Sequence, residues 1–187
     1  MRWPLVVALA AGIATSACGS GTGPSGSGTL RMALKDGPFS DAKALFVTVS
    51  QVEVHKSDTP DGAWIKIVGE KTCDLKRLET AQAALGSQPL DSGHYTQVRL
   101  VVTRAVIDFA NVTTGDACAV APPPDVLPPS QANVTIPSGE VKLIRGFDIP
   151  EGETKTMLLD FDGDKSMHLI SNGGYMMSPV INVVSVQ

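Results

Sequence analysis

The run HYTQVRLVVTRAVIDF, residues 94–109, limits most strongly what this chain can fold into. Its middle part alternates apolar and polar side chains with a period of two. The apolar members of this alternation are Val98, Leu100 and Val102. A period of two places one set of side chains on each face of a β-strand. The run therefore predicts a long strand with one buried face and one face in contact with water.

Several other segments carry similar strand signals, and turn residues such as Gly, Pro, Asp and Ser separate them. They span residues 29–34, 44–55, 63–68, 133–137, 141–149, 154–161 and 175–186. No regular alternation of strands with helices occurs, so the pattern does not favour a parallel α/β sheet. We predict an all-β fold over residues 29–187. The expected architecture is an antiparallel β-sandwich, immunoglobulin-like or transthyretin-like, with about eight or nine strands and at most one short helix.

Two strand segments carry local irregularities. The apolar positions of 44–55 change phase near Ser50 and Gln51, which predicts a β-bulge or a strand break there. Pro179 lies inside 175–186 and cannot donate a ladder hydrogen bond. The last segment is therefore expected to be an edge strand or to be distorted at Pro179.

One segment has a helical pattern and another a loop composition. Residues 73–86 have Asp74 as a plausible N-cap and Gly86 as a stop signal, and we expect about two helical turns there. Residues 119–130, AVAPPPDVLPPS, are rich in proline, which supplies no backbone donor. This stretch predicts an extended and exposed loop.

Length and charge exclude some classes of protein. The chain has 187 residues, which suits one domain. Its formal net charge is −4, and its lysines and arginines form no run. Since binding to nucleic acid relies on clustered basic side chains, we expect no nucleic-acid partner.

The N-terminus has the pattern of a targeting segment. The apolar stretch LVVALAAGIA follows Arg2 and is too short to span a bilayer, but it suits the core of a signal peptide. The letters TSAC follow and resemble the lipobox of bacterial lipoproteins, although Thr15 stands where leucine is usual. We therefore expect a signal peptide over residues 1–17 and lipidation of Cys18. Cleavage near Ala17 without lipidation is the alternative.

The residues after Cys18 are expected to form a tether. Residues 18–28 are mainly Gly, Ser and Thr, a composition typical of flexible linkers. They contain a G-x-G-x-x-G pattern, but no strand precedes it and no helix follows it. We attribute the pattern to the glycine content of the segment and not to a dinucleotide site.

If Cys18 carries a lipid, two of the three cysteines remain available to form a disulfide. Cys73 and Cys118 then form an even pair in an oxidising compartment, and a disulfide between them is the natural expectation. Two separate buried thiols are the alternative.

Several segments follow one another in an order that resembles a known family. They are LKDGP, VSQVEVH, GAWIKI, SGHYTQVRLVV, IPSGEVKLIRGFDIPEG, LLDFDGDKSM and GGYMMSPVINVV. Together they resemble the bacterial family called domain of unknown function 4382, found on secreted and lipid-anchored proteins. The resemblance covers residues 29–185 and implies a β-sandwich at the cell envelope. It implies no catalytic residue, because the family has no established activity. The chain departs from the family pattern in residues 110–132 and in the pair Cys73 and Cys118.

The stretch DFDGDKS contains a candidate metal site. Asp160, Asp162 and Asp164 offer carboxylate oxygens of the kind that Ca²⁺ accepts. The spacing is not that of an EF-hand, since Gly163 comes too early and Ser171 stands where a glutamate is needed. A solvated strand face that ends in a turn explains the same residues.

Two further sets of side chains are weaker candidates. A polar and aromatic row that suits an extended ligand or a glycan consists of Tyr95, Gln97, Arg99 and Thr103, although a solvated sheet face is the favoured explanation. The histidines lie on separate segments, without a metal-binding spacing; they are His55, His94 and His168. We expect them to be isolated surface residues, with a zinc or copper site across strands as the alternative.

These features together predict a membrane-anchored envelope lipoprotein, located at the outer membrane since Gly19 is not the aspartate that retains lipoproteins at the inner membrane of enteric bacteria. Its domain is expected to be a non-enzymatic binding or structural module without a cofactor. Its partner is expected to be an envelope protein or a glycan. A Ca²⁺-dependent adhesive or glycan-binding module is one alternative, and a hydrolase of unrecognised type is another.

Overall fold

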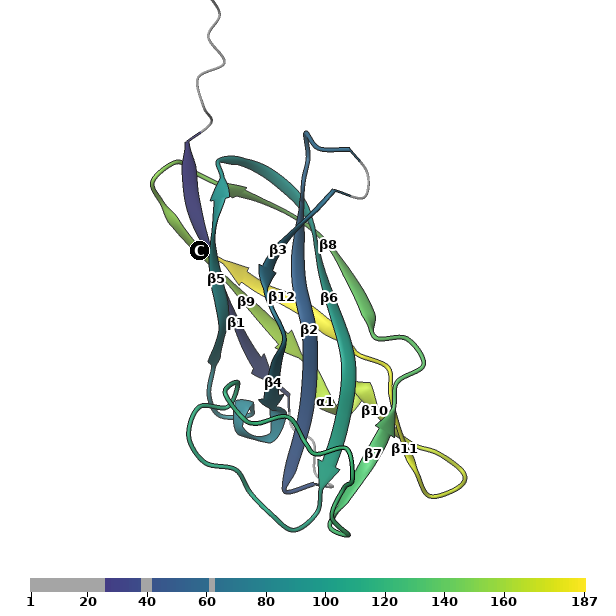
Figure 1. Ribbon diagram of the computed structural model, residues 1–187. Coiled ribbons are helices and arrows are strands. Elements are labelled where there is room, and N and C mark those ends of the chain that lie inside the picture. Colours follow the sequence, from purple (N-terminus) through teal and green to yellow (C-terminus); the bar gives the residue numbers. More distant parts are fainter. Residues whose placement is uncertain (1–25, 38–41, 61–62) are drawn as a thin grey trace, which may run out of the picture.

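The chain folds into two β-sheets packed face to face. The computed structural model describes residues 26–37, 42–60 and 63–187 (Figure 1). One sheet has four strands in the order β12-β9-β1-β5, and the other has eight. The four strands are β1 (Ser27–Asp36), β5 (Ala83–Asp91), β9 (Thr154–Phe161) and β12 (Ile181–Val186). The prediction of an all-β sandwich is confirmed.

The larger sheet is built around two long strands, β2 (Ala44–Lys56) and β6 (Gly93–Asp108), which pair along most of their length. On one side β2 also pairs with β3 (Trp64–Val68) and β4 (Lys71–Asp74). On the other side β6 pairs with β7 (Gln131–Thr135) and β8 (Glu140–Ile149). The order continues from β7 to β11 (Tyr175–Met177) and β10 (Met167–Leu169).

The core lies between the sheets and comes from the inward positions of their strands. In β6 the alternation predicted from the sequence is present, with Val98, Leu100 and Val102 buried. In β1 the buried positions are Leu30, Met32 and Leu34, and in β9 they are Met157, Leu159 and Phe161. The two sheets thus meet through rows of apolar side chains spaced two residues apart.

The predicted bulge in β2 is confirmed. The pairing with β6 shifts between Thr48 and Val49 and again between Val49 and Gln51, so Ser50 has no partner in the register. A bulge adds one residue to a strand and therefore reverses the faces of the residues that follow. This is why Val47 and Val52, an odd number of residues apart, both lie in the core.

Pro179 marks a change of sheet. The last predicted strand divides there, because β11 ends at Met177 in the larger sheet and β12 begins at Ile181 in the smaller one. A residue without a backbone N–H is tolerated at such a crossing, since the chain leaves one ladder before it joins the next.

The helix predicted over residues 73–86 is mostly wrong. Asp74 does act as an N-cap, but for a single 3-10 turn, Leu75–Leu78. Gly86, the predicted stop signal, lies inside β5 and pairs with Met32 of β1. Leu75 and Leu78 are buried as a helical pattern requires, so the apolar spacing was informative for one turn only. The short α-helix of the described residues is α1, Gly163–Ser166, a single turn between β9 and β10.

The sheets are not wholly antiparallel. β1 runs parallel to β9, and β11 runs parallel to β7. Alternation along a strand reports which face is buried but not which strand lies beside it, so the sequence pattern held no signal for these two pairs.

Residues 109–130 cover part of the outer face of the larger sheet. Val120 and Leu127 pack on a small second cluster, Ala44, Phe46 and Val106, on the side away from the main core. The Arg104 guanidinium donates hydrogen bonds to the backbone oxygens of Pro123 and Pro124, each at 2.6 Å. Residues 119–130 contain no strand, as predicted, but they are not wholly exposed, because Pro123 is buried. This proline-rich part therefore serves as a cover for β2 and β6.

The first strand starts earlier than the tether composition suggests. β1 begins at Ser27, two positions before the predicted start at Thr29. Gly28 pairs with Leu90, and a Cβ at Gly28 would lie 2.3 Å from the backbone oxygen of Pro150. Glycine is needed here because the turn between β8 and β9 approaches the backbone of β1 closely.

Candidate functional site

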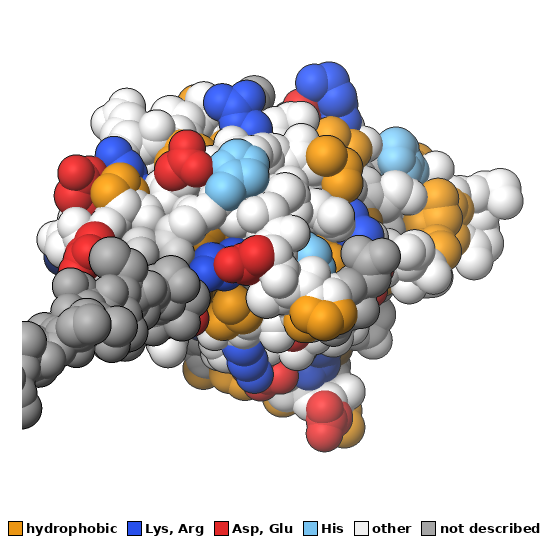
Figure 2. All heavy atoms as spheres, turned by 90° about the horizontal axis from the view of Figure 1, so that it is seen from above, with side chains coloured by type: hydrophobic (Ala, Val, Ile, Leu, Met, Phe, Trp, Pro, Cys, Tyr) orange, Lys and Arg blue, Asp and Glu red, His pale blue; other side chains and the backbone are white. Residues whose placement is uncertain are grey.

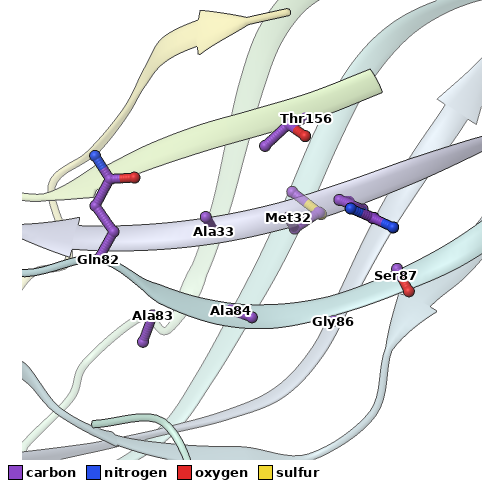
Figure 3. Close-up of a pocket in the computed structure, with 9 residues that line it drawn as sticks. Met32, Ala33, Gln82, Ala83, Ala84, Gly86, Ser87 and Thr156 are labelled. Carbon is purple, nitrogen blue, oxygen red and sulfur yellow. The ribbon is translucent and has the colours of Figure 1, made fainter. Parts of the chain in front are cut away.

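A hollow of about 640 Å³ lies on the outer face of the four-stranded sheet (Figure 3). Strands β1, β5 and β9 and the residues just before β5 form it. Its lining includes Arg31, Ala33, Gln82, Ala84, Ser87 and Thr156. In Figure 3 Ala84 and Ser87 lie along β5, and Thr156 lies across β1 from them.

The strand register brings these side chains together in rows. Arg31 of β1 lies opposite Thr156 of β9 on one side and opposite Ser87 of β5 on the other. All three are exposed, as expected for a row on the outer face, because Leu30 and Met32 on either side of Arg31 are buried. An arginine therefore lies between two hydroxyl side chains, each a direct cross-strand neighbour.

The hollow itself comes from a bulge and from small side chains. Met32 pairs with Gly86 and Ala33 pairs with Ala84, so Leu85 is an extra residue in β5. The side chain of Leu85 is fully buried. The outer positions beside it, Ala33 and Ala84, carry only methyl groups, which lowers the surface relative to the rows around it, while Gly86 faces Val68 in the core.

The hollow carries one charge, that of Arg31, among the described residues that line it. No carboxylate of the described part of the chain lies within ion-pair distance of that guanidinium. Four residues further along β1, Lys35 is paired with Asp160 at 3.1 Å and is thereby neutralised. The electrostatic potential in the hollow is therefore positive, and it comes from the Arg31 guanidinium.

The predicted row on β6 is only partly correct. Tyr95 is fully buried and stacks on Phe147, with ring centroids 5.3 Å apart, because the register of β6 and β8 shifts between Tyr95 and Gln97. Its hydroxyl donates to the backbone oxygen of Asp91 at 2.9 Å, as in the tyrosine corners of Greek-key sandwiches. Burial is the main reason, with the charges of Asp91 and Asp58 contributing, why the pKa of Tyr95 is raised to about 12.

Of the other members of that row, Arg99 is held in a network of contacts, while Gln97 is half-buried and Thr103 is exposed. The Arg99 guanidinium lies 4.3 Å from the centre of the Trp64 ring, and its Nε donates to Glu53 at 2.7 Å. Glu140 is a more distant second partner at 3.8 Å. Since Arg99 is already paired and stacked, we assign this cluster a role in holding β2, β3, β6 and β8 together.

The structure does not bring the three aspartates of DFDGDKS together as metal ligands. Asp160 pairs with Lys35, while Asp162 caps α1 and accepts from Lys165 N–H at 3.1 Å and from its Nζ at 2.5 Å. The hydrogen bonds from Lys165 hold the pKa of Asp162 below its ordinary value, and those to Asp162 raise the pKa of Lys165. Asp164 is exposed in the helical turn. Within residues 26–37, 42–60 and 63–187 no group of three or more His, Cys, Asp or Glu is placed to hold a metal ion.

The histidines also lie apart, and not all are at the surface. His55 is buried and contacts the edge of Trp64, with ring centroids 5.6 Å apart. His94 is exposed, and its Nδ1 lies 2.7 Å from Asp148 Oδ1. His168 is exposed on β10. The expectation of surface histidines is therefore wrong for His55, because β3 and the turn between β2 and β3 cover it.

Cys73 and Cys118 form a disulfide, as predicted. Cys73 lies in β4 and Cys118 in the segment 109–130, and both are buried. The backbone N–H of Asp74 donates to the oxygen of Ala117 at 2.7 Å, beside the bridge. The disulfide and this hydrogen bond attach the covering segment to β4.

The predicted signal peptide, residues 1–17, and Cys18 lie outside the described residues, as does most of the predicted tether 18–28. In the described part of the chain no helix is long and apolar enough to cross a membrane.

Sequence reasoning missed the hollow. Arg31, Ser87 and Thr156 are far apart in the chain, and none belongs to a motif. The one available signal was the alternation in residues 29–34, which places Arg31 on an outer face. The cross-strand neighbours of Arg31 depend on how β1 pairs with β5 and β9.

Two packed sheets, an internal disulfide and a hollow on one sheet face define an all-β sandwich domain. The model of one family, Domain of unknown function (DUF4382), matches residues 27–179, and the chain belongs to this family. The match begins at the first residue of β1 and ends at Pro179, before β12. Comparisons with curated proteins and with solved structures found no match.

Proposed function

We propose that this protein is a bacterial envelope lipoprotein whose β-sandwich is a non-enzymatic binding or structural module. The observation that carries the proposal is the disulfide between Cys73 and Cys118. The chain has three cysteines, so Cys18 remains as the one outside the bridge. Disulfides persist in oxidising compartments outside the cytoplasm, where lipoproteins are located. The sequence TSAC after a short apolar stretch supports lipidation of Cys18.

The shape of the domain suits an anchored module. The start of β1 and residues 109–130 lie at opposite ends of the sandwich in Figure 1. Strand β6 has 16 residues and runs along the molecule. At about 3.3 Å per residue, it spans roughly 50 Å. An anchor at Cys18 would leave the disulfide-bound end far from the membrane and the outer sheet faces accessible to a partner.

The surface near the tether suits a protein partner or a glycan better than a nucleic acid. Figure 2 views this end of the molecule, and acidic and basic side chains are interspersed there with apolar ones. Binding to a phosphate backbone relies on a continuous basic surface. We propose an envelope protein or a glycan as the partner, with the hollow beside Arg31 as its candidate contact.

The anchor is tested by cell fractionation. Cys18→Ser is expected to move the protein from the membrane fraction to the soluble fraction, because no acyl chain can then be attached. Ser25→Ala, in the same segment, is the matched control and should remain with the membrane. Equal membrane association of Cys18→Ser would contradict the anchor.

The outer-membrane location has a separate test. In an enteric host, Gly19→Asp is expected to shift the protein from the outer to the inner membrane on a sucrose gradient, because aspartate after the lipidated cysteine retains lipoproteins there. If the wild-type protein is already in the inner membrane, the proposed location is wrong while the anchor stands.

A further inference from the structure

We infer that the hollow over β1, β5 and β9 binds a small organic carboxylate, with the Arg31 guanidinium as its anchor. This inference rests on the binding role proposed above and names the chemical class of ligand. It does not depend on the lipid anchor.

Arg31 differs from the arginines whose partners the structure shows. Arg99 is paired with Glu53 and stacked on Trp64, and Arg104 is held by two proline carbonyl groups. Arg31 has neither kind of partner among the described residues, yet it lines a hollow of about 640 Å³. An unpaired guanidinium beside a concave surface retains its full capacity to bind an oxyanion.

The position of Arg31 is held by the sheet. β1 is an interior strand of the four-stranded sheet, paired with β9 on one side and with β5 on the other. The hydroxyl groups of Thr156 and Ser87 lie on its two cross-strand neighbours, so both donors flank the base of the arginine side chain. A ligand oxygen bound by the guanidinium is thus within reach of neutral hydroxyl donors supplied by rigid strands.

The charge balance favours a carboxylate over a phosphate. The hollow supplies one positive charge, which matches a monoanion, and the planar guanidinium fork suits the two oxygens of a carboxylate. A phosphate dianion would retain an excess negative charge on a protein whose formal net charge is −4. The nearest cation along β1, Lys35, is neutralised by Asp160 and does not supply a second charge.

The rest of the hollow limits the size and polarity of the ligand. Ala33 and Ala84 form a shallow apolar floor next to the arginine row, and the exposed amide of Gln82 lies at its end. This lining suits a short aliphatic or amide-containing body attached to the carboxylate. The site contains no aromatic ring among the described lining residues, so stacking of a sugar ring is not part of the recognition.

The experiment compares two probes that differ only in charge, N-acetyl-L-alanine and N-acetyl-L-alaninamide. Binding to the full-length protein, purified in detergent, is measured by ligand-observed saturation-transfer NMR. The carboxylate is expected to bind at least tenfold more tightly than the amide. Arg31→Gln should reduce its affinity at least tenfold, and the double variant Ser87→Ala/Thr156→Val at least threefold. Arg145→Gln, which removes an exposed arginine of β8 outside the hollow, is the control and should bind normally.

Several results would overturn the inference. They are equal binding of acid and amide, no binding of either, or a carboxylate affinity that Arg31→Gln leaves unchanged. If inorganic phosphate displaces the carboxylate at lower concentration than N-acetyl-L-alanine itself, the site is a phosphate site and the carboxylate assignment is wrong. Thermal melting of each variant verifies that it is folded. Since the Cys18→Ser experiment is scored without any ligand, failure of this inference and failure of the anchor are distinguished.

Discussion

The carboxylate of Asp36, at the end of β1, accepts a hydrogen bond from the backbone N–H of Gly163, the first residue of α1, at 3.0 Å. The two residues are 127 positions apart in the chain. Asp36 is 5% exposed, and its second oxygen, Oδ2, is buried without a hydrogen-bond partner. Burial raises the pKa of Asp36 to about 8 even though the Gly163 N–H acts to lower it, and the negative charges of Glu79 and Asp160 add to the increase.

This carboxyl predicts a stability that falls as pH rises. Between pH 4 and pH 8 the unfolded chain has lost the Asp36 proton while the folded chain retains it, because the ordinary pKa is 3.8 and the folded one about 8. The folded state then binds more protons, so the contribution of Asp36 to the free energy of unfolding decreases with pH, by at most about 1.4 kcal/mol per pH unit. Asp36→Asn keeps an acceptor for Gly163 and is expected to remove this dependence.

Urea denaturation at pH 5 and at pH 8.5 tests the prediction. The gain in stability of Asp36→Asn over wild type should be larger at the higher pH. Asp164→Asn, on the exposed face of α1, is the control and should show no such difference. A gain that is equal at both values would mean that Asp36 ionises normally in the folded protein.

The disulfide is expected to contribute strongly to stability. Its bridge closes a separation of 45 residues. Loss of the constraint on the unfolded chain predicts a decrease of about 3–4 kcal/mol in the free energy of unfolding for Cys73→Ala/Cys118→Ala. Equilibrium urea unfolding measures the loss, and wild-type protein unfolded with a reducing agent should match the double variant. A decrease below about 1 kcal/mol would show that the segment 109–130 is held mainly by its packing and by Arg104.

Gly28→Ala is expected to destabilise the domain. The new methyl group would lie 2.3 Å from the backbone oxygen of Pro150 and 2.7 Å from the side chain of Ile149, so the β8–β9 turn must move. Overpacking of this kind costs about 1–3 kcal/mol. Gly37→Ala is the matched control, because its methyl group meets no atom of the described residues closer than 3.8 Å. Thermal melting compares the two, and equal melting temperatures would contradict the close approach of the turn to β1.

Tyr95→Phe tests the hydrogen bond between the Tyr95 hydroxyl and the oxygen of Asp91. The variant keeps the stacking on Phe147 and loses one hydrogen bond, so a decrease of about 1 kcal/mol in stability is expected. Tyr175→Phe, a half-buried position whose ring contacts Phe109, is the control and should change stability little. If both substitutions have the same effect in urea denaturation, the hydroxyl of Tyr95 has no specific role.

The alternation of apolar and polar residues correctly predicted which face of most strands is buried, but it did not predict which strands pair with one another. It placed Val98 and Leu100 of β6 in the core, and the phase change at Ser50 located the bulge in β2. It placed Tyr95 on the wrong face, because a bulge between β6 and β8 reverses the strand there and leaves no mark in the local pattern. Gly86 had the position of a helix stop, yet pairing with β1 made this segment a strand, since tertiary contacts override local propensity.

The same difference between local and tertiary information applies to the side chains that the sequence grouped as candidate sites. Cys73 and Cys118 were paired by counting cysteines, which needs no geometry. The aspartates of DFDGDKS were grouped by their spacing. In the structure Asp160 instead pairs with Lys35 on the neighbouring strand, and Asp162 pairs with Lys165 in α1. Lipidation of Cys18 stays a prediction from the sequence alone.

The sequence by itself determined that this chain forms a β-sandwich, which side chains point inward along most strands, and that Pro179 interrupts the last one. These properties follow from the two-residue period of an extended backbone and are local. The tertiary structure decided that β1 lies between β5 and β9, that Arg31 stands between Ser87 and Thr156, and that Asp36 meets Gly163. Such neighbours depend on closing long loops so that the largest apolar area is buried at once, a property of the whole chain and not of any segment of it.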